Sequence, residues 1–173
     1  IHVFDREGDI SEVFDTVTQM ANTGVIVRAA HNRAVSETES YLWEEVTSQP
    51  VQFTQELKLP KTHNRSERQA KISVRYTPLK LRSPQRIKTQ KHFAVYAVYV
   101  IEIDPPEGEK PVEWMLLTTE KVTNPTEASV ILRWYSYRWR IEEYHKILKS
   151  GCQVESYRLK GNSMAVLLGF LTR

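Results

Sequence analysis

Residues 1–30, IHVFDREGDISEVFDTVTQMANTGVIVRAA, predict a strand, a helix and a second strand in succession. The segments 1–4 and 25–30 are short apolar runs, and the stretch between them repeats apolar side chains at helical spacing. Asp9 and Glu12 have the spacing of an N-terminal capping pair for this helix. A strand, a helix and a strand in this order favour a parallel βαβ unit, so the sequence predicts an α/β fold.

Polar side chains follow both predicted strands. Asp5 comes directly after the first strand, and Arg28, His31 and Arg33 come at the end of the second. Sheets of this class place their functional sites at the carboxyl ends of the strands. An Asp after a strand is also a common helix cap, and basic residues after a strand are common in solvated loops, so position alone leaves both interpretations open.

Beyond residue 48 the pattern changes from helical spacing to alternation. A short helix is expected at residues 41–46, and Pro and Gly place a loop at 104–111. Alternating apolar and polar side chains are typical of strands in an antiparallel sheet. We therefore expect an antiparallel β subdomain over residues 49–121, with strands near 51–58, 71–77, 93–103 and 114–119.

A long helix is predicted toward the end of the chain. Asn124 is a suitable N-cap, Pro125 suits the first helical position, and Gly151 is a typical terminator. Within it, YSYRWRIEEYHKILK at 135–149 carries two features. One face, within an arc of about 60°, holds Tyr135, Arg138, Glu142 and Lys149. A separate apolar stripe is expected to be buried: Val130, Trp134, Tyr137, Ile141, Tyr144 and Leu148.

Composition excludes several classes of protein. The chain has 173 residues, of which 40% are hydrophobic, enough for one core with an appended subdomain. No apolar run approaches the roughly 20 residues that span a bilayer, so we expect no membrane role. The single cysteine, Cys152, cannot form an internal disulfide.

The positive charge is concentrated in one segment. Residues 58–91 contain eleven Lys or Arg and one acid, Glu67, whereas the whole chain has a net charge of +3. Such a block is typical of a surface that binds a polyanion, most commonly nucleic acid. Alternatively, exposed strands use Lys and Arg to stay soluble and to avoid pairing with other chains.

Three segments together resemble the IS4 group of DDE transposases: VFDREGDI at 3–10, VEWMLLTTE at 112–120, and the helix at 135–149. In that family a Tyr, an Arg, a Glu and a Lys follow one another at the spacing found here, and the Glu is the last acid of the catalytic triad. The resemblance implies an RNase H-like α/β core interrupted by a mostly β insertion. Residues 1–48 and 122–173 would form the core, and 49–121 the insertion.

The resemblance also assigns roles to individual residues. Asp5 and Glu142 would be catalytic carboxylates that bind Mg²⁺, with Mn²⁺ as a possible substitute. Trp114 would stack a flipped base, although a tryptophan at the start of a strand is otherwise a common core residue. The remaining residues would contact DNA phosphates: Tyr135, Arg138, Lys149, Arg28, His31 and Arg33.

The resemblance implies a cut-and-paste transposase that nicks transposon ends, forms a hairpin and joins the ends to target DNA. Its partners would be end and target DNA and a second copy of the protein, in the bacterial cytoplasm beside the nucleoid. The family's first catalytic Asp precedes the second by a long segment, and only four residues precede Asp5. We therefore expect an N-terminally truncated fragment that is inactive alone. Two alternatives are a DNA-binding remnant without activity and a nuclease that only hydrolyses.

Overall fold

We analysed a computed structural model of the chain, which describes residues 1–60, 67–88, 91–138, 144 and 147. The chain divides into two compact units, residues 1–136 and 137–173. The first unit contains every strand and helix described below. No helix in the described residues is long and apolar enough to cross a membrane.

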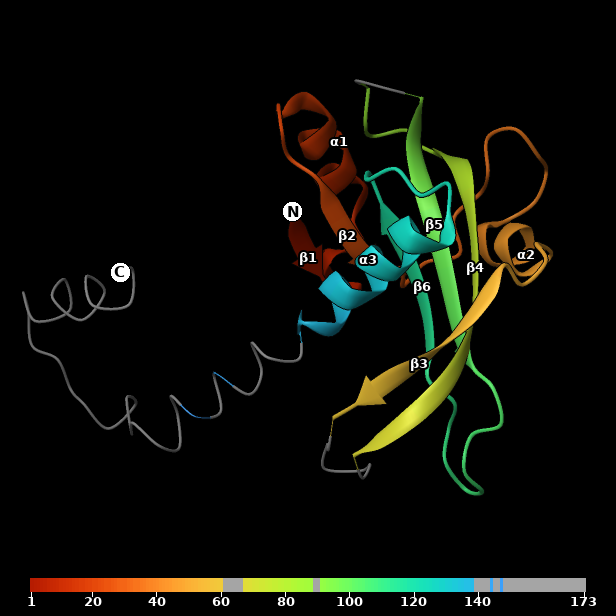
Figure 1. Ribbon diagram of the computed structural model, residues 1–173. Coiled ribbons are helices and arrows are strands. Elements are labelled where there is room, and N and C mark those ends of the chain that lie inside the picture. Colours follow the sequence, from red (N-terminus) through yellow and green to blue (C-terminus); the bar gives the residue numbers. More distant parts are fainter. Residues whose placement is uncertain (61–66, 89–90, 139–143, 145–146, 148–173) are drawn as a thin grey trace, which may run out of the picture. The chain divides into compact units, whose positions relative to one another are not determined.

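The first unit is built on one mixed six-stranded sheet with the order β1-β2-β6-β5-β4-β3 (Figure 1). Its strands are β1 (His2–Phe4), β2 (Val25–Arg28), β3 (Phe53–Leu59), β4 (Arg68–Arg82), β5 (His92–Glu102) and β6 (Glu113–Thr118). The helices are the 3-10 turn η1 (Arg6–Gly8), α1 (Ser11–Gln19), α2 (Leu42–Thr47) and α3 (Pro125–Ser136).

The βαβ prediction for the first 30 residues is confirmed. β1 and β2 are parallel neighbours, with Phe4 opposite Val27, and α1 lies between them in the sequence. The prediction that Asp9 caps α1 is wrong, because the helix begins one residue later, with Ile10 at the N-cap and no side-chain cap bond. The Asp9 carboxylate instead binds groups that follow β2.

Helices cover both faces of the sheet. Alternate side chains of a strand point to opposite faces, so Val25 and Val27 share a face that Ile26 does not. On that face Phe14 of α1 and Leu42 of α2 join one buried apolar cluster with β2, β4, β5 and β6. α3 lies on the other face, in front of β6 and β5 in Figure 1, where its side chains contact Trp114 and Gln55.

α3 begins as the sequence predicts. Asn124 accepts the backbone N–H of Glu127 at 2.9 Å, and Pro125 occupies the first helical position. The Glu127 carboxylate accepts the N–H and the hydroxyl of Thr123, which hold its pKa below the usual range. These bonds fix the start of the helix that carries Tyr135.

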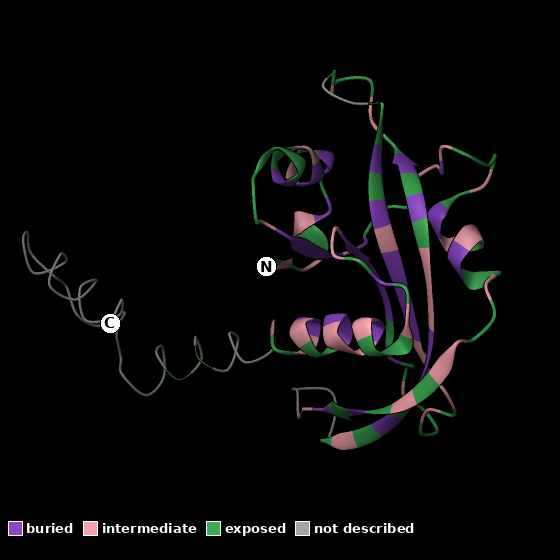
Figure 2. Ribbon diagram, turned by 45° about the horizontal axis from the view of Figure 1, so that its top comes forward, coloured by how far each residue is buried: buried purple, intermediate pink, exposed green. Residues whose placement is uncertain are grey.

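The predicted buried stripe of this helix is wrong within the described residues, because Val130 and Trp134 are only half-buried and Tyr137 and Tyr144 are exposed. The buried side chains of α3 are Ala128, Ile131, Leu132 and Tyr135. In Figure 2 the buried colour recurs along α3 between half-buried stretches. Both sets of residues have helical spacing, and they occupy different faces of the helix. The set that includes Tyr135 packs against the sheet, because Trp114 of β6 provides an aromatic partner for Tyr135. Ile141 and Leu148 lie outside the described residues.

The antiparallel strands occur where alternation predicts them. β3, β4, β5 and β6 pair antiparallel in sequence order, and α2 matches the short helix expected at 41–46. β6 also pairs with β2, so these strands continue the sheet that begins with the βαβ unit. A separate subdomain with the boundaries 49–121 stays a prediction.

Among the described residues, four of the basic side chains in the segment 58–91 form ion pairs with acids of the same chain. Lys58 pairs with Glu67, Lys80 with Glu37, and Arg86 with Glu12. Arg68 pairs with two acids, Glu102, which is buried, and Glu109, which is partly exposed. Because most of these acids lie outside residues 58–91, the charge count overstates how basic this part of the surface is.

Gly8 is required by the close packing of β1 against η1. A Cβ at this position would overlap the Cβ and Cγ of Phe4. We expect Gly8→Ala to lower the free energy of unfolding by ~1–3 kcal/mol, because the backbone around Asp5 must shift to make room. Chemical denaturation followed by circular dichroism measures this change. Gly24→Ala is the control, since its Cβ would mainly meet the flexible end of Glu120; an equal loss in both variants would contradict the prediction.

Candidate active site

The candidate site lies where β1 and β2 end side by side. Asp5 follows β1, and Arg28 is the last residue of β2. Their side chains face each other, with 3.8 Å between Asp5 Oδ1 and an Arg28 guanidinium nitrogen. The Asp5 side chain is 38% exposed, so its carboxylate is accessible from solvent. The strand-end position expected for Asp5 is therefore confirmed.

Tyr135 of α3 contacts Asp5 from the face of the sheet that α3 covers. Its hydroxyl donates to Asp5 Oδ1 at 3.2 Å, although the two residues are separated by 130 positions in the sequence. The tyrosine is only 1% exposed. A buried phenol at this distance restricts the orientation of the carboxylate. The sequence placed Tyr135 on a DNA-contacting face, whereas the structure places its hydroxyl against the predicted metal ligand.

Arg28 is itself held in place by β6. One guanidinium nitrogen donates to the backbone carbonyl of Glu113 at 3.1 Å. The Glu113 carboxylate accepts the Tyr99 hydroxyl at 2.6 Å. Burial and this hydrogen bond raise the pKa of Tyr99 above its usual range, so the phenol stays protonated. The positive charge beside Asp5 is thus anchored to the central strands.

Trp114 supports the site from within the sheet. Its ring packs edge-on against Tyr135, with 5.0 Å between centroids, and the residue is 4% exposed. This geometry is the favourable arrangement for an aromatic pair. In this conformation the indole face is covered, so stacking on a DNA base requires the surroundings of the ring to move. The placement agrees with the core interpretation that the sequence left open for Trp114.

The basic residues after β2 have different environments. His31 is exposed, as a DNA-contacting residue would need to be. Arg33 is engaged with Asp9 at 2.7 Å, and its side chain is 13% exposed. Sequence reasoning missed Asp9 as a partner of Arg33, because the pairing depends on tertiary contact between two loops. A DNA phosphate would have to compete with a buried carboxylate for Arg33.

Three residues of the predicted site are not placed against it. Arg138 belongs to the second compact unit, which is described by itself. Glu142 and Lys149 lie outside the described residues. The roles of all three stay predictions.

The described part of the site has the right chemistry for a hard cation but not a full set of ligands. Asp5 offers carboxylate oxygens, which Mg²⁺ and Mn²⁺ prefer. Among the described residues no group of three or more His, Cys, Asp or Glu side chains could hold a metal ion. Asp5 therefore fits as one ligand and needs at least one more carboxylate.

Removing the Tyr135 hydroxyl tests whether it orients Asp5. We expect Tyr135→Phe to lower the free energy of unfolding by ~1 kcal/mol, since one hydrogen bond is lost and the ring packing is kept. Metal affinity should fall by about tenfold, the range for a group that orients a ligand. Denaturation and Mn²⁺ titration measure the two effects. Tyr137→Phe is the matched control because Tyr137 is exposed; the prediction fails if both variants keep wild-type affinity.

The sequence matches the family described as the transposase DDE domain over residues 15–172. The match covers well over half of the chain and begins ten residues after Asp5. Domains of this family are enzymes that act on DNA and generally depend on divalent metal ions. The mixed α/β architecture with one six-stranded sheet is compatible with their RNase H-like fold. The chain therefore belongs to the family of transposase DDE domains.

Proposed function

We propose that the chain forms the catalytic core of a cut-and-paste transposase of the IS4 group, most like the Tn5 transposase. The observation that supports the proposal best is the environment of Asp5. This partly exposed carboxylate follows the edge strand β1 of the βαβ unit and is oriented by Arg28 and the buried Tyr135 hydroxyl. A solvated surface acid does not need two such partners, one of them 130 residues away.

Asp5 and Glu142 are proposed as the ligands of Mg²⁺ or Mn²⁺. Bound divalent ions activate the attacking oxygen and stabilise the leaving oxygen of a phosphodiester. Glu142 is seven residues after Tyr135, or about two helical turns, and that spacing would put both on one helix face. Since Tyr135 contacts Asp5, this spacing supports Glu142 as the second ligand.

The other residues are proposed to bind and position DNA. Arg138 and Lys149 would hold phosphates of the cleaved strand, Arg138 through its planar fork and Lys149 through a point charge. His31 is the exposed candidate at the end of β2. Arg28 would contact a phosphate from its position beside Asp5. There its positive charge would also reduce the repulsion between the carboxylate and the DNA backbone.

The reaction proposed for the full-length protein has four steps. Water nicks one strand at the transposon end and leaves a 3′-hydroxyl. This hydroxyl attacks the opposite strand to form a hairpin, a second water opens the hairpin, and the end is joined to target DNA. We propose that two copies act together on two ends and that they work on chromosomal DNA in the bacterial cytoplasm.

Cleavage of a duplex that carries the element's terminal repeat tests this function. We expect the full-length protein with Mg²⁺ to produce a nick and then a hairpin, resolved on a denaturing gel. Glu142→Gln should abolish both products without loss of DNA binding. Binding without any cleavage by the wild type would support the inactive remnant, and nicking without a hairpin would support a simple nuclease. Either result would overturn the proposal.

A further inference from the structure

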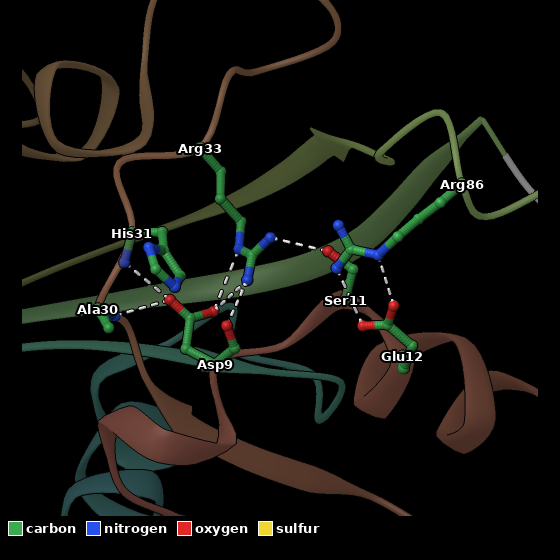
Figure 3. A network of polar contacts seen from close by, with 7 residues as sticks. All are labelled: Asp9, Ser11, Glu12, Ala30, His31, Arg33 and Arg86. Carbon is green, nitrogen blue, oxygen red and sulfur yellow. Dashed lines mark hydrogen bonds and ion pairs between the residues drawn. The ribbon is translucent and has the colours of Figure 1, made fainter.

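A second carboxylate close to the site is almost completely buried. Asp9 is 1% exposed, and a buried charge is costly unless it is paired and hydrogen-bonded. Oδ2 accepts the backbone N–H groups of Ala30 at 2.7 Å and His31 at 2.9 Å. Oδ1 accepts hydrogen bonds from Nε and Nη2 of Arg33 at 3.1 and 2.7 Å. Both oxygens are thus satisfied by groups that follow β2 (Figure 3).

Arg33 extends this network to the start of α1. Its Nη2 also donates to the backbone carbonyl of Asp9 at 2.7 Å, and its Nη1 donates to the Ser11 hydroxyl at 2.8 Å. Figure 3 shows the guanidinium between Asp9 and Ser11. A rigid fork with this many bonds cannot shift without breaking several of them. The pair therefore fixes the chain at residues 9–11 relative to the segment after β2.

This network holds one end of the short segment that carries Asp5. At one end, Phe4 is in register with Val27 in the parallel pair of strands. At the other end, Asp9 is bonded to Ala30 and His31, just beyond Arg28. Only η1 lies between, and Gly8 donates its N–H to the carbonyl of Asp5 at 2.9 Å. The segment is held at both ends against the same strand, and Asp5 lies within it.

We propose that Asp9 and Arg33 are positioning residues that hold the Asp5–Gly8 segment and so fix the Asp5 carboxylate beside Arg28 and Tyr135. The proposal rests on the proposed function for its link to metal binding. On this account Arg33 is not a DNA contact. Its guanidinium is part of the support of the site, and the loop carrying His31 is held by the same carboxylate.

The chain contains a matched control pair that joins α1 to the segment between β4 and β5. Glu12 and Arg86 form a two-point ion pair, with nitrogen–oxygen distances of 2.7 and 3.2 Å, a few residues along the chain from Asp9. Both side chains are about half exposed, and Arg86 lowers the pKa of Glu12 mainly through the hydrogen bond. The two pairs share the same chemistry. They differ in burial and in whether they connect to the segment after β2.

The test compares Asp9→Asn, Arg33→Lys and Glu12→Gln in the full chain labelled with ¹⁵N. We expect the first two variants to shift the amide resonances of Asp5, Arg6 and Gly8 more than those of β4 and β5, and Glu12→Gln to leave them unchanged. Arg33→Lys keeps the charge without the fork, so it remains informative if Asp9→Asn fails to fold. Unchanged Asp5–Gly8 amides in a folded variant would overturn the proposal, as would equal shifts in Glu12→Gln.

Mn²⁺ separates this proposal from the proposed function. In the wild type, Mn²⁺ should broaden the amide of Asp5, and Arg33→Lys should raise the Mn²⁺ concentration for half broadening by about tenfold. A role confined to stability would lower the melting temperature and leave this concentration unchanged, which would contradict positioning. No broadening in the wild type would contradict the metal role of Asp5, while the amide shifts alone would still decide whether Asp9 and Arg33 hold the segment.

Discussion

Asp5→Asn is expected to reduce metal-dependent nicking by the proposed transposase at least about 1,000-fold, or ~4 kcal/mol of activation free energy. The amide has nearly the same shape as the carboxylate and can still accept the Tyr135 hydroxyl. It lacks the negative charge that a divalent ion requires of its ligand. Nicking of an end duplex under single-turnover conditions measures the loss.

The fold should be unaffected by this substitution. Asp5 is partly exposed and its ion pair with Arg28 is long, so the free energy of unfolding should change by less than about 1 kcal/mol. Glu7→Gln is the control, since it removes an exposed acid from the same segment. Its nicking rate should stay within about twofold of the wild type, as is usual for surface substitutions. If Asp5→Asn retains more than a tenth of the wild-type rate, Asp5 is not a catalytic ligand.

Trp114→Ala is expected to lower the free energy of unfolding by ~3–5 kcal/mol, the range for removal of a large aromatic side chain from a core. The ring is 4% exposed and supports Tyr135, which in turn contacts Asp5. Urea denaturation of the variant and the wild type measures the difference. A loss below about 1 kcal/mol would show that the ring is not packed in solution as it is here.

Trp114→Phe separates packing from base stacking. A phenyl ring keeps most of the apolar contact with Tyr135, so the free energy of unfolding should fall by clearly less than in Trp114→Ala. If the indole also stacks a flipped base, Trp114→Phe should slow hairpin formation while nicking stays near the wild-type rate. Equal effects on both steps would leave Trp114 with its core role alone.

The elements that the sequence predicts best are those with a local pattern. Residues 1–30 contain two apolar runs around a helical stripe, and they form β1, α1 and β2 as predicted. Alternation predicts β3 to β6, and Asn124 with Pro125 predicts the start of α3. Each of these signals depends on neighbours in sequence, so it does not require knowledge of the tertiary structure.

The site could be predicted only in part because its contacts are not local. The position of Asp5 follows from the strand that precedes it. Its contact with Tyr135 depends on which of two faces of α3 meets the sheet, and the apolar pattern favoured the wrong one. The pairing of Asp9 with Arg33 joins two loops, each of which suggested another role. Charge counting overestimated the basic segment for the same reason, since its neutralising acids are distant in the sequence.

Iron-directed cleavage of the protein tests the central claim, that Asp5 and Glu142 hold a divalent ion, most directly. Fe²⁺ bound in place of Mg²⁺ generates radicals in the presence of ascorbate and peroxide, and these cut the backbone near the ion. We predict cuts beside both residues, located by mass spectrometry, that excess Mg²⁺ suppresses and Asp5→Asn removes. Cuts elsewhere in the chain, with none beside Asp5, would contradict the account.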